Sequence, residues 1–409
     1  MQSMIMVKKL VYKFTDVPTY NTESSPQLRQ TMLLNDHIHF FLKQKKDCIS
    51  EHYKTKKWDK YKKFANDYEL IFTSSNNFPS VSSYQAISRS FFKLWEILHD
   101  FEDTFKFKMK SSVRAAFLAE GPGGFMEAFA RYRPAPLFPQ DTIFGITLLS
   151  TDKNIPNWKL PKDVMDCGNI HLLKGADNTG SLYNMENIEY FAQQIGEHSV
   201  DLVTSDGGFD FSMDFNNQED MSMHLIICEM YMALRLQAQG GSFVLKIYDI
   251  HTMNTMRLLW ILKAHYKDLY LVKPLSSRPA NSEKYIVGTG FVGRLEKRMM
   301  EVMQTIISTQ TIDVLHKITP AIPFIHQVTM YNVFYISRQA LNIHKTLTYI
   351  HLLRLNQPHD AHFKSNLRHQ LKKSLKWCYK YHMAISLNAL RSYNTMYFTR
   401  PPSLAPAPI

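Results

Sequence analysis

The chain has 409 residues, of which 45% are hydrophobic and 21% are charged. This length accommodates one large core with additions, or two or three domains, and the composition excludes a disordered chain. A formal charge of +12 and a pI near 9.3 favour a polyanionic partner such as nucleic acid, although a solvated basic face gives the same balance.

The cysteines and the lengths of the apolar segments indicate the cellular environment of the protein. The four cysteines form no CxxC pair, which speaks against a zinc ribbon or a disulfide framework and favours a reducing environment. No stretch approaches the roughly 18 uninterrupted apolar residues of a membrane span, and MIMV near the start is too short for a signal-peptide core. We therefore expect a soluble, intracellular protein. The cysteines are Cys48, Cys167, Cys228 and Cys378.

Residues 1–85 predict a basic, helical N-terminal extension. Apolar residues recur at helical spacing between about residues 26 and 70. The segment KTKKWDKYKKF adds a basic run, which either contacts a phosphate backbone or forms a solvated helix face. After the turn-rich TSSNNFPSVSS, residues 84–105 show a second helical pattern.

From Val113 onward, short β-like runs alternate with helical ones. Such alternation is typical of a doubly wound α/β sheet of mostly parallel strands, in which ligands bind at the carboxyl ends of the strands. The strand candidates are residues 114–120, 142–148, 170–176, 200–206, 241–249 and 268–275, with 284–291 as an edge strand. The helix candidates between them are residues 123–132, 187–195, 223–239 and 253–266.

Beyond about residue 297 the sequence predicts a mostly helical, strongly basic C-terminal region that ends in a frayed tail. Within RHQLKKSLKWCYKYH, lysines alternate with Trp377, Tyr379 and Tyr381. That mixture suits phosphate contact with base stacking, but a helix that packs its aromatic residues inward is an equal alternative. We thus predict three parts, residues 1–85, 86–296 and 297–409.

The segment FLAEGPGGFMEAF places an acid, Glu120, and three glycines between a predicted strand and helix. Neither GxGxxG nor GxxxxGK[ST] is present, which disfavours a nicotinamide site and a P-loop. Glycines at such a turn let the backbone approach a ligand. An acid there suits a nucleoside that carries a cationic amino acid, as S-adenosylmethionine does, although a plain strand-to-helix connection is the alternative.

Two further acids follow predicted strands. Asp206 ends VDLVTSD and is followed by two glycines, so it either fixes a ligand or caps the next turn. Asp177, beside Asn178, suits the edge of an adenine or ribose, with a simple Asx turn as the alternative.

Lys246 stands in the apolar strand GGSFVLKIYD, where an ammonium ion is costly to bury. A lysine in such a strand often extends its amine to solvent while its stem stays buried. Parallel-sheet geometry would instead bring Glu283 beside it, and Lys93, on an otherwise apolar helix face, is a candidate second cation. An acid and a cation near an amine tune its pKa.

Together these segments resemble the FtsJ-like (RrmJ-type) ribose 2'-O-methyltransferases, most closely the branch that acts on mRNA caps. The resemblance covers roughly Ser88 to Gly290 and is carried by EGPGGF, DNTG, SDGGFD, GGSFVLK and KPLSSRPANSEKYIV. It implies a Rossmann-like methyltransferase domain with helical N- and C-terminal extensions. The chain is also similar to an FtsJ-like protein of large cytoplasmic DNA viruses, and this resemblance implies a viral origin.

The resemblance implies methyl transfer from S-adenosylmethionine to a ribose 2'-hydroxyl, with a Lys-Asp-Lys-Glu tetrad at Lys93, Asp206, Lys246 and Glu283. Lys246, when neutral, would receive the hydroxyl proton. Lys93 and Asp206 would orient the hydroxyl and the methyl donor, and Glu283 would position Lys246. The positive charge of Lys93 would also lower the pKa of Lys246.

The resemblance further implies the binding residues and partners. Asn281 would contact the RNA, which is expected to be the capped 5' end of an mRNA, and capping proteins are candidate partners in the cytoplasm. No metal is required. A ribosomal or transfer RNA substrate remains an alternative, as does an inactive fold that serves as an RNA-binding or capping-complex subunit. The expected cofactor contacts are Glu120, Gly121, Pro122, Gly123, Gly124, Phe125, Thr147, Leu148, Asp177 and Asp206.

Overall fold

The structure of the protein is a computed structural model. It describes residues 10–15, 36–53, 55–75, 77–152, 155–166, 169–208, 216–352 and 361–397. Several predictions lie outside these residues: the start of the first helical pattern before residue 36, Cys167, the last two residues of SDGGFD, and the C-terminal tail. Cys48, Cys228 and Cys378 are free thiols.

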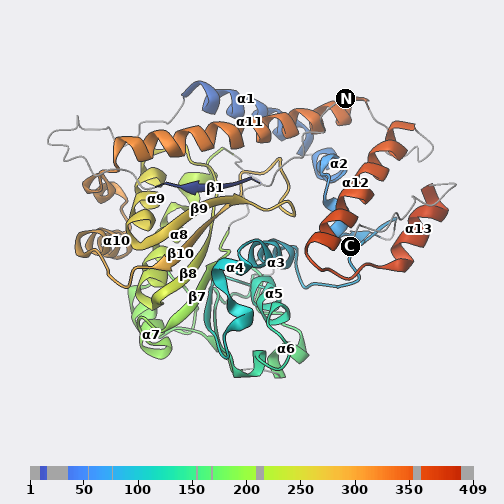
Figure 1. Ribbon diagram of the computed structural model, residues 1–409. Coiled ribbons are helices and arrows are strands. Elements are labelled where there is room, and N and C mark those ends of the chain that lie inside the picture. Colours follow the sequence, from blue (N-terminus) through green and yellow to red (C-terminus); the bar gives the residue numbers. More distant parts are fainter. Residues whose placement is uncertain are drawn as a thin grey trace. The chain divides into compact units, whose positions relative to one another are not determined.

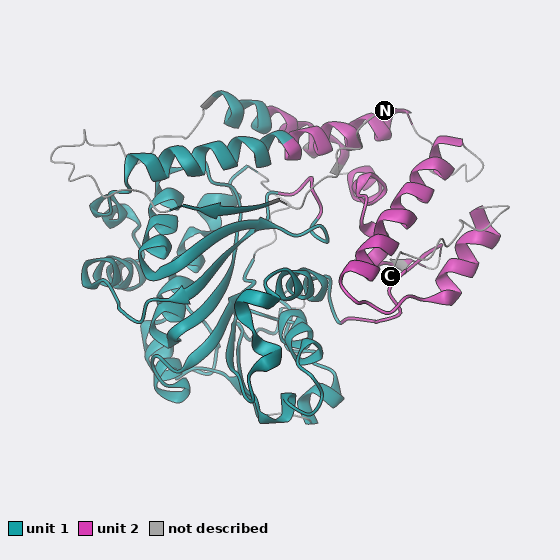
Figure 2. Cartoon of the chain, in the orientation of Figure 1, with its two compact units in different colours: residues 1–43, 87–277, 282–337 teal, residues 44–86, 278–281, 338–409 magenta. Residues whose placement is uncertain are grey.

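The chain divides into two compact units, which Figure 2 shows in different colours. Unit 1 comprises residues 1–43, 87–277 and 282–337, and unit 2 comprises residues 44–86, 278–281 and 338–409. Two of the five boundaries fall within helices, α1 (Asp36–Tyr53) and α11 (Ile322–Leu352), and the other three fall in loops. The three-part division predicted from sequence character stays a prediction.

Unit 1 is built on an eight-stranded sheet with the order β1-β9-β10-β8-β7-β4-β5-β6 (Figure 1). Strands β4 to β9 run in one direction, while β10 and β1 run in the other. The sheet is therefore mostly parallel, as predicted. The strands are β1 (Leu10–Phe14), β4 (Arg114–Leu118), β5 (Thr142–Ile146), β6 (Asn169–Leu173), β7 (Val200–Ser205), β8 (Gln237–Ile247), β9 (Tyr266–Lys273) and β10 (Lys284–Phe291).

Helices cover both faces of this sheet, because its central strands are apolar on both sides. Ala116 and Leu118 of β4 face a core cluster that α7 to α11 complete. The alternate residue Phe117 faces the other way and lies 5.8 Å from the Phe129 ring of α5. The helices of unit 1 are α3 (Ser90–Asp100), α4 (Glu102–Phe105), α5 (Gly124–Tyr132), α6 (Lys162–Asp166), α7 (Met185–Ile195), α8 (Gln218–Leu236), α9 (Met253–His265) and α10 (Lys297–Thr309).

The strand order reverses between β4 and β7. From β4 the chain adds β5 and β6 on one side, then crosses back to place β7 and β8 on the other. At such a switch point the flanking loops diverge and leave a crevice at the carboxyl ends of the strands. This edge of the sheet is where the sequence predicts ligand-binding residues.

The prediction of residues 284–291 as an edge strand is wrong. β10 lies between β8 and β9, pairs antiparallel with both, and is buried along nearly its whole length. Its apolar run is that of a central strand with covered faces. Among the residues that the structure describes, the edge strands are β6, which overlaps the predicted strand 170–176, and β1. The sequence analysis did not predict β1.

Unit 2 is mainly helical. Its α2 buries Trp58, Tyr61 and Phe64 from the basic segment KTKKWDKYKKF. The elements wholly within unit 2 are α2 (Lys57–Ala65), α12 (Ala361–Lys380), α13 (Leu387–Tyr397) and the two-stranded β2 (Ser74–Ser75) and β3 (Phe78–Pro79). Among the described residues of the chain, no helix is both long and apolar enough to cross a membrane.

A fully buried ion pair anchors the start of β5. Arg133 donates from Nε to Asp141 at 2.6 Å and from Nη2 to the second carboxylate oxygen at 2.8 Å, and both side chains are solvent-inaccessible. Asp141 also accepts the backbone N–H of Val113 at 2.7 Å. The other partners of the two side chains are uncharged backbone groups, so removing either member leaves the opposite charge buried without its counter-ion.

We predict that Asp141→Ala lowers the free energy of unfolding by about 3–5 kcal/mol. Urea unfolding monitored by circular dichroism measures this loss. The matched control is Asp163→Ala, which breaks an Arg–Asp pair with Arg131 at the surface, and it should cost less than about 1 kcal/mol. Equal losses in the two variants would contradict the role assigned to burial.

Candidate active site

Four side chains predicted to act together come from four separate segments of unit 1. Asp206 directly follows β7, Lys246 lies near the end of β8, Glu283 directly precedes β10, and Lys93 lies in α3. β10 runs antiparallel to β8, so its first residues lie at the carboxyl end of β8. The predicted neighbourhood of Glu283 and Lys246 therefore exists, but through an antiparallel strand and not through parallel-sheet geometry.

Lys246 forms a buried pair with Asp206. Its Nζ lies 3.2 Å from the Asp206 carboxylate and donates to the Asp206 backbone carbonyl at 2.6 Å. The Tyr285 hydroxyl donates to the same carboxylate at 2.8 Å. With only 8% of the residue exposed, Lys246 does not extend its amine to solvent. Desolvation is thus offset by an opposite charge and hydrogen bonds.

Lys93 and Glu283 form a second pair. Lys93 Nζ lies 2.7 Å from the Glu283 carboxylate, whose other oxygen accepts the Ser277 hydroxyl at 2.8 Å. Lys273, at the end of β9, donates to the Glu283 backbone carbonyl at 2.6 Å. The carboxylate is therefore held on both oxygens.

Helix α3 is fixed to the loop before β10 by the buried acid Glu96. Its carboxylate accepts the backbone N–H groups of Leu275 and Ser276 at 2.7 and 3.1 Å, and the Ser276 hydroxyl at 3.0 Å. Lys93 is three residues earlier in α3, almost one helical turn, and so shares a face with Glu96. This contact explains how a helix outside the sheet delivers Lys93 to Glu283.

The two pairs are electrostatically linked. Burial lowers the pKa of Lys246, but the charges of Asp206 and Glu283 outweigh burial and hold this pKa above its ordinary value. Burial raises the pKa of Glu283, but Lys93, Lys246 and Lys273 outweigh it and lower this pKa to about 2. Lys246 is therefore protonated and Glu283 ionised at neutral pH.

Two further acids lie buried beside this network. Glu120, after β4, accepts the Thr204 hydroxyl at 2.6 Å, and burial together with the Asp206 charge raises its pKa. Burial, reinforced by Asp206, raises the pKa of Glu229 in α8 to about 8. One Glu229 carboxyl oxygen is buried without a hydrogen-bond partner. Lys246 is therefore surrounded by four acids, Asp206, Glu283, Glu120 and Glu229.

The glycine turn after β4 is shaped by its contacts with neighbouring segments. Gly123 has a φ of 110°, a conformation that favours glycine. A Cβ on Gly124 would collide with the hydroxyls of Ser88 and Ser90. The Gly121 backbone N–H donates to the Thr147 hydroxyl at 3.0 Å, which joins this turn to the end of β5.

The remaining predicted cofactor residues differ in accessibility. Pro122 is partly buried in the turn, whereas the Phe125 ring is fully buried and lies 5.8 Å from that of Tyr285, so only its backbone can meet a ligand. Leu148 is exposed. Asp177 is also exposed, and its carboxylate accepts the backbone N–H of Thr179, which is the Asx turn named as the alternative.

Asp177 nevertheless has an organised carboxylate. It accepts the Thr179 hydroxyl at 2.7 Å and the side-chain amides of Asn187 and Asn184 at 2.8 and 3.2 Å. These donors and the backbone N–H lower its pKa. Asn281 belongs to unit 2, where it is exposed and its backbone N–H donates to the Arg278 carbonyl.

Sequence analysis missed four residues of this network: Tyr285, Lys273, Ser277 and Glu229. Tyr285 is the partner of Lys246 in the β10–β8 register, which no local pattern reveals. Glu229 did leave a signal, because an acid within the apolar helix segment IICEMYMALRL is the same kind of oddity as Lys246. No three His, Cys, Asp or Glu side chains in the described parts of the chain are arranged to hold a metal ion.

This arrangement fits a cationic ligand. Burial and the charge of Asp206 raise the pKa of Glu120 and that of Glu229, which favours their protonated forms. A positive charge beside them would favour their ionised forms, whereas an anion such as a pyrophosphate would keep them neutral and gain no attraction from them. The site, at the switch point of a mostly parallel sheet with one antiparallel strand inserted, defines the Rossmann-like methyltransferase class.

A sequence model of the FtsJ-like methyltransferase family matches residues 86–291, half of the chain. The protein therefore belongs to this family, as predicted. Its members take their methyl group from S-adenosylmethionine, whose sulfonium and ammonium groups are positively charged, in agreement with the buried acids of the site.

Three curated relatives extend the comparison. The chain is 33% identical over 180 residues to cap-specific mRNA (nucleoside-2'-O-)-methyltransferase 1A of Caenorhabditis briggsae, which covers 43% of this chain and 20% of that protein. It is 34% identical over 175 residues to cap-specific mRNA (nucleoside-2'-O-)-methyltransferase 1 of Trypanosoma brucei brucei, covering 42% of this chain and 45% of that protein.

The third relative is the inactive cap-specific mRNA (nucleoside-2'-O-)-methyltransferase 1B of Caenorhabditis briggsae. Here the identity is 32% over 180 residues, which covers 43% of this chain and 20% of that protein. The matches thus span from a fifth to less than half of the relatives' length. These three relatives come from Caenorhabditis and Trypanosoma, and the viral origin of the chain stays a prediction.

We predict that Glu229→Gln stabilises the protein, and more so at high pH. Folding raises the pKa of Glu229 from 4.5 to about 8. Between these two pH values the folded protein keeps the proton of Glu229, whereas the unfolded chain loses it. Ionisation of Glu229 therefore lowers the free energy of unfolding more and more as pH rises, and glutamine, which does not ionise, removes this loss. The stabilisation should be roughly 3 kcal/mol larger at pH 8 than at pH 5.

Thermal unfolding of both proteins at the two pH values measures this difference. The control is Glu186→Gln, an exposed acid in the first turn of α7, whose effect should be small at both pH values. A shift in melting temperature for Glu229→Gln that is the same at pH 5 and pH 8 would argue against a raised pKa.

Proposed function

We propose that the protein is an S-adenosylmethionine-dependent RNA ribose 2'-O-methyltransferase that acts on the cap-proximal nucleotide of mRNA. The observation that carries this proposal is the pair of buried, linked ion pairs, Lys246 with Asp206 and Lys93 with Glu283, at the switch point of the sheet. The cap-specific relatives support the choice of RNA.

In this proposal, neutral Lys246 accepts the proton of the ribose 2'-hydroxyl while the hydroxyl oxygen bonds to the methyl carbon. The bond between sulfur and the methyl group of S-adenosylmethionine would break, and S-adenosylhomocysteine would leave. The contacts favour a division of roles in which Asp206, assisted by Tyr285, holds the Lys246 amine. Glu283 instead holds Lys93, which leaves Lys93 to orient the hydroxyl. The tetrad predicted from sequence thus acts as two pairs, with Asp206 in the positioning role first given to Glu283.

Lys246 must lose its proton before it can act as a base, and its acidic neighbours oppose this. When bound, S-adenosylmethionine supplies the methyl group on a positive sulfonium, which lowers the pKa of a nearby amine. Lys93 cannot supply that charge alone, because its own is offset by Glu283. Glu120 and the turn from Gly121 to Gly124 would hold the cofactor, with Asp177 near its adenine and Asn281 at the RNA.

Two other functions remain candidates. One is 2'-O-methylation of a ribosomal or transfer RNA, because the four side chains fix the chemistry and not the RNA. The other is an inactive subunit that binds RNA or a capping complex, which the relative named as inactive keeps open. Capping proteins as partners and a cytoplasmic location belong to the same proposal.

The test is transfer from labelled S-adenosylmethionine to matched RNAs with and without a methylated cap, followed by mapping of the methylated nucleotide. We expect label on the ribose next to the cap, and a loss of about 10²–10⁴-fold in Lys246→Ala with cofactor binding retained. The control is Lys267→Ala, at an exposed lysine of β9, which should leave transfer unchanged.

Label on a base, or undiminished transfer by Lys246→Ala, would refute this mechanism. Equal label on uncapped RNA would point to the alternative substrates. Bound RNA without transfer would favour the inactive subunit.

The pH dependence of the reaction gives a further prediction. In the free enzyme the pKa of Lys246 lies above its ordinary value, so between pH 6 and pH 9 only a small, growing fraction is neutral. We therefore expect kcat/KM, which reports ionisations of the free enzyme, to rise about tenfold per pH unit. The residual activity of Lys246→Ala should lack this slope. A flat profile for the unmodified enzyme would count against Lys246 as the proton acceptor.

A further inference from the structure

The net positive charge of the chain comes from unit 2 alone. Unit 2 contains 20 lysines and arginines against 6 aspartates and glutamates, a formal charge of +14. Unit 1, with the candidate active site, contains 28 basic and 30 acidic residues, a formal charge of −2. A methyltransferase unit of this balance has no net attraction for a polyanion, so long-range attraction must come from unit 2.

Within unit 2, helix α12 has the strongest charge bias. It contains six lysines and arginines and no acid in 20 residues. Arg368, Lys372 and Lys376 are exposed and follow one another at intervals of four residues, and Tyr379 is exposed one turn later. At 100° per residue these four side chains fall within an arc of about 80° and span roughly 16 Å along the helix. We call them the α12 ridge.

The opposite face of α12 is buried, which fixes the direction of the ridge. Gln370, 2% exposed, donates to the backbone carbonyls of Lys63, Phe64 and Asn66 at 3.0, 3.0 and 2.7 Å. Asn366 adds a bond to the Phe64 carbonyl at 2.9 Å. The helix cannot rotate about its axis without breaking these bonds, so the ridge is held toward solvent.

The acids of unit 2 do not neutralise the ridge lysines. Asp67 lies 3.4 Å from Lys345 and 3.3 Å from His369, and Glu69 binds Arg278 at 2.7 Å. Within the described segments of the chain, no acid pairs with Lys372 or Lys376. Their charges are therefore available to an external anion.

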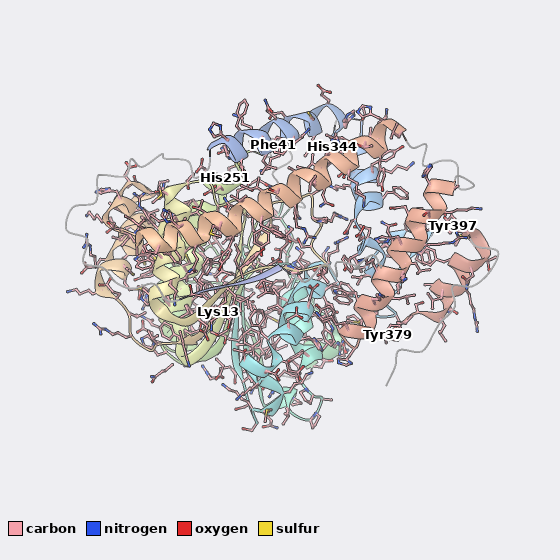
Figure 3. All side chains as sticks on the ribbon, turned by 45° about the horizontal axis from the view of Figure 1, so that its top comes forward. Lys13, Phe41, His251, His344, Tyr379 and Tyr397 are labelled. Atoms are coloured by element: carbon pink, nitrogen blue, oxygen red, sulfur yellow. The ribbon has the colours of Figure 1, made fainter. Side chains whose placement is uncertain are left out.

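The aromatic residues in and directly after α12 divide between the two alternatives left by the sequence. Trp377 and Tyr381 are buried, with ring centroids 4.8 Å apart, so they pack inward. Tyr379 is 58% exposed, and Figure 3 marks it near the carboxyl end of the helix. A basic row that ends in an accessible aromatic ring matches single-stranded nucleic acid, whose phosphates follow one another and whose bases stack on such rings.

We propose that the α12 ridge binds the single-stranded RNA substrate through its phosphates, with Tyr379 as a stacking platform for one base. This inference rests on the proposed function for the choice of RNA. An acidic protein would also be attracted by the charge, but it has no need of an exposed aromatic ring in line with the lysines.

The test uses the full-length protein and a short fluorescent single-stranded RNA, with fluorescence anisotropy measured over a series of salt concentrations. Lys372→Glu combined with Lys376→Glu should weaken binding at least tenfold and reduce the salt slope by roughly 1.4, which corresponds to two lost phosphate contacts. The matched control is Lys267→Glu with Lys297→Glu, the same charge change at exposed lysines of unit 1, which should alter the affinity less than threefold.

Tyr379 separates stacking from charge. Tyr379→Ala should weaken RNA binding about tenfold with an unchanged salt slope, and Tyr379→Phe should restore it, because the ring supplies the contact. Unchanged RNA affinity in the double lysine variant overturns the proposal. So does an equal loss in the unit 1 control, or a double variant that loses only binding of polyglutamate, which would indicate an acidic protein partner.

The ridge and the proposed chemistry fail in distinguishable ways. The double lysine variant should bind S-adenosylmethionine normally and, at saturating RNA, retain its turnover, so its defect is confined to KM. If no RNA is methylated by the unmodified protein but the ridge variants still lose RNA affinity, the ridge stands and the proposed reaction falls. If RNA is methylated and the ridge variants keep their KM, the ridge alone falls.

Discussion

The burial of the Lys246 amine at the carboxyl end of β8 is the constraint on which the site depends. An ammonium ion in this position is tolerated only because Asp206 supplies both a carboxylate and a backbone carbonyl within 3.2 Å. Asp206 can do so because β7 and β8 are adjacent parallel strands that end at the same edge. The strand order of the sheet is thus a condition for the charge pair.

The charges around this pair form a set whose protonation depends on what is bound. The surroundings favour the charged forms of Lys246 and Glu283, whereas they raise the pKa of Glu120 and that of Glu229 and so favour the neutral forms of these two acids. An added cation pushes all the acids toward ionisation and Lys246 toward neutrality at once. The charged state of Lys246, which the proposed reaction requires to be neutral, is therefore a property of the unliganded site.

Much of the fold and of the candidate site followed from local pattern. Strand–helix alternation predicted the sheet, and an isolated lysine in an apolar strand indicated Lys246. The predictions that failed concern contacts between residues far apart in the sequence. We predicted β10 as an edge strand because its own residues do not indicate which strands pair with it. Tyr285 was missed for the same reason, since its partner is 39 positions away and is set by register. The charge separation between the units emerged only when the noncontiguous segments of unit 2 were known.

The antiparallel insertion of β10 has a consequence for how this site tolerates change. Side chains alternate along a strand, so Tyr285, opposite Lys246, stands between neighbours that face the other way, among them Lys284. A single residue gained or lost inside β10 would exchange these two, and a second ammonium would take the place of the hydroxyl that binds Asp206. A change of length in the loop before β10 would leave this alternation intact and would instead alter the span between Ser277 and Glu283, whose side chains are hydrogen-bonded. The two sides of Glu283 are therefore constrained differently, by side-chain alternation after it and by this span before it.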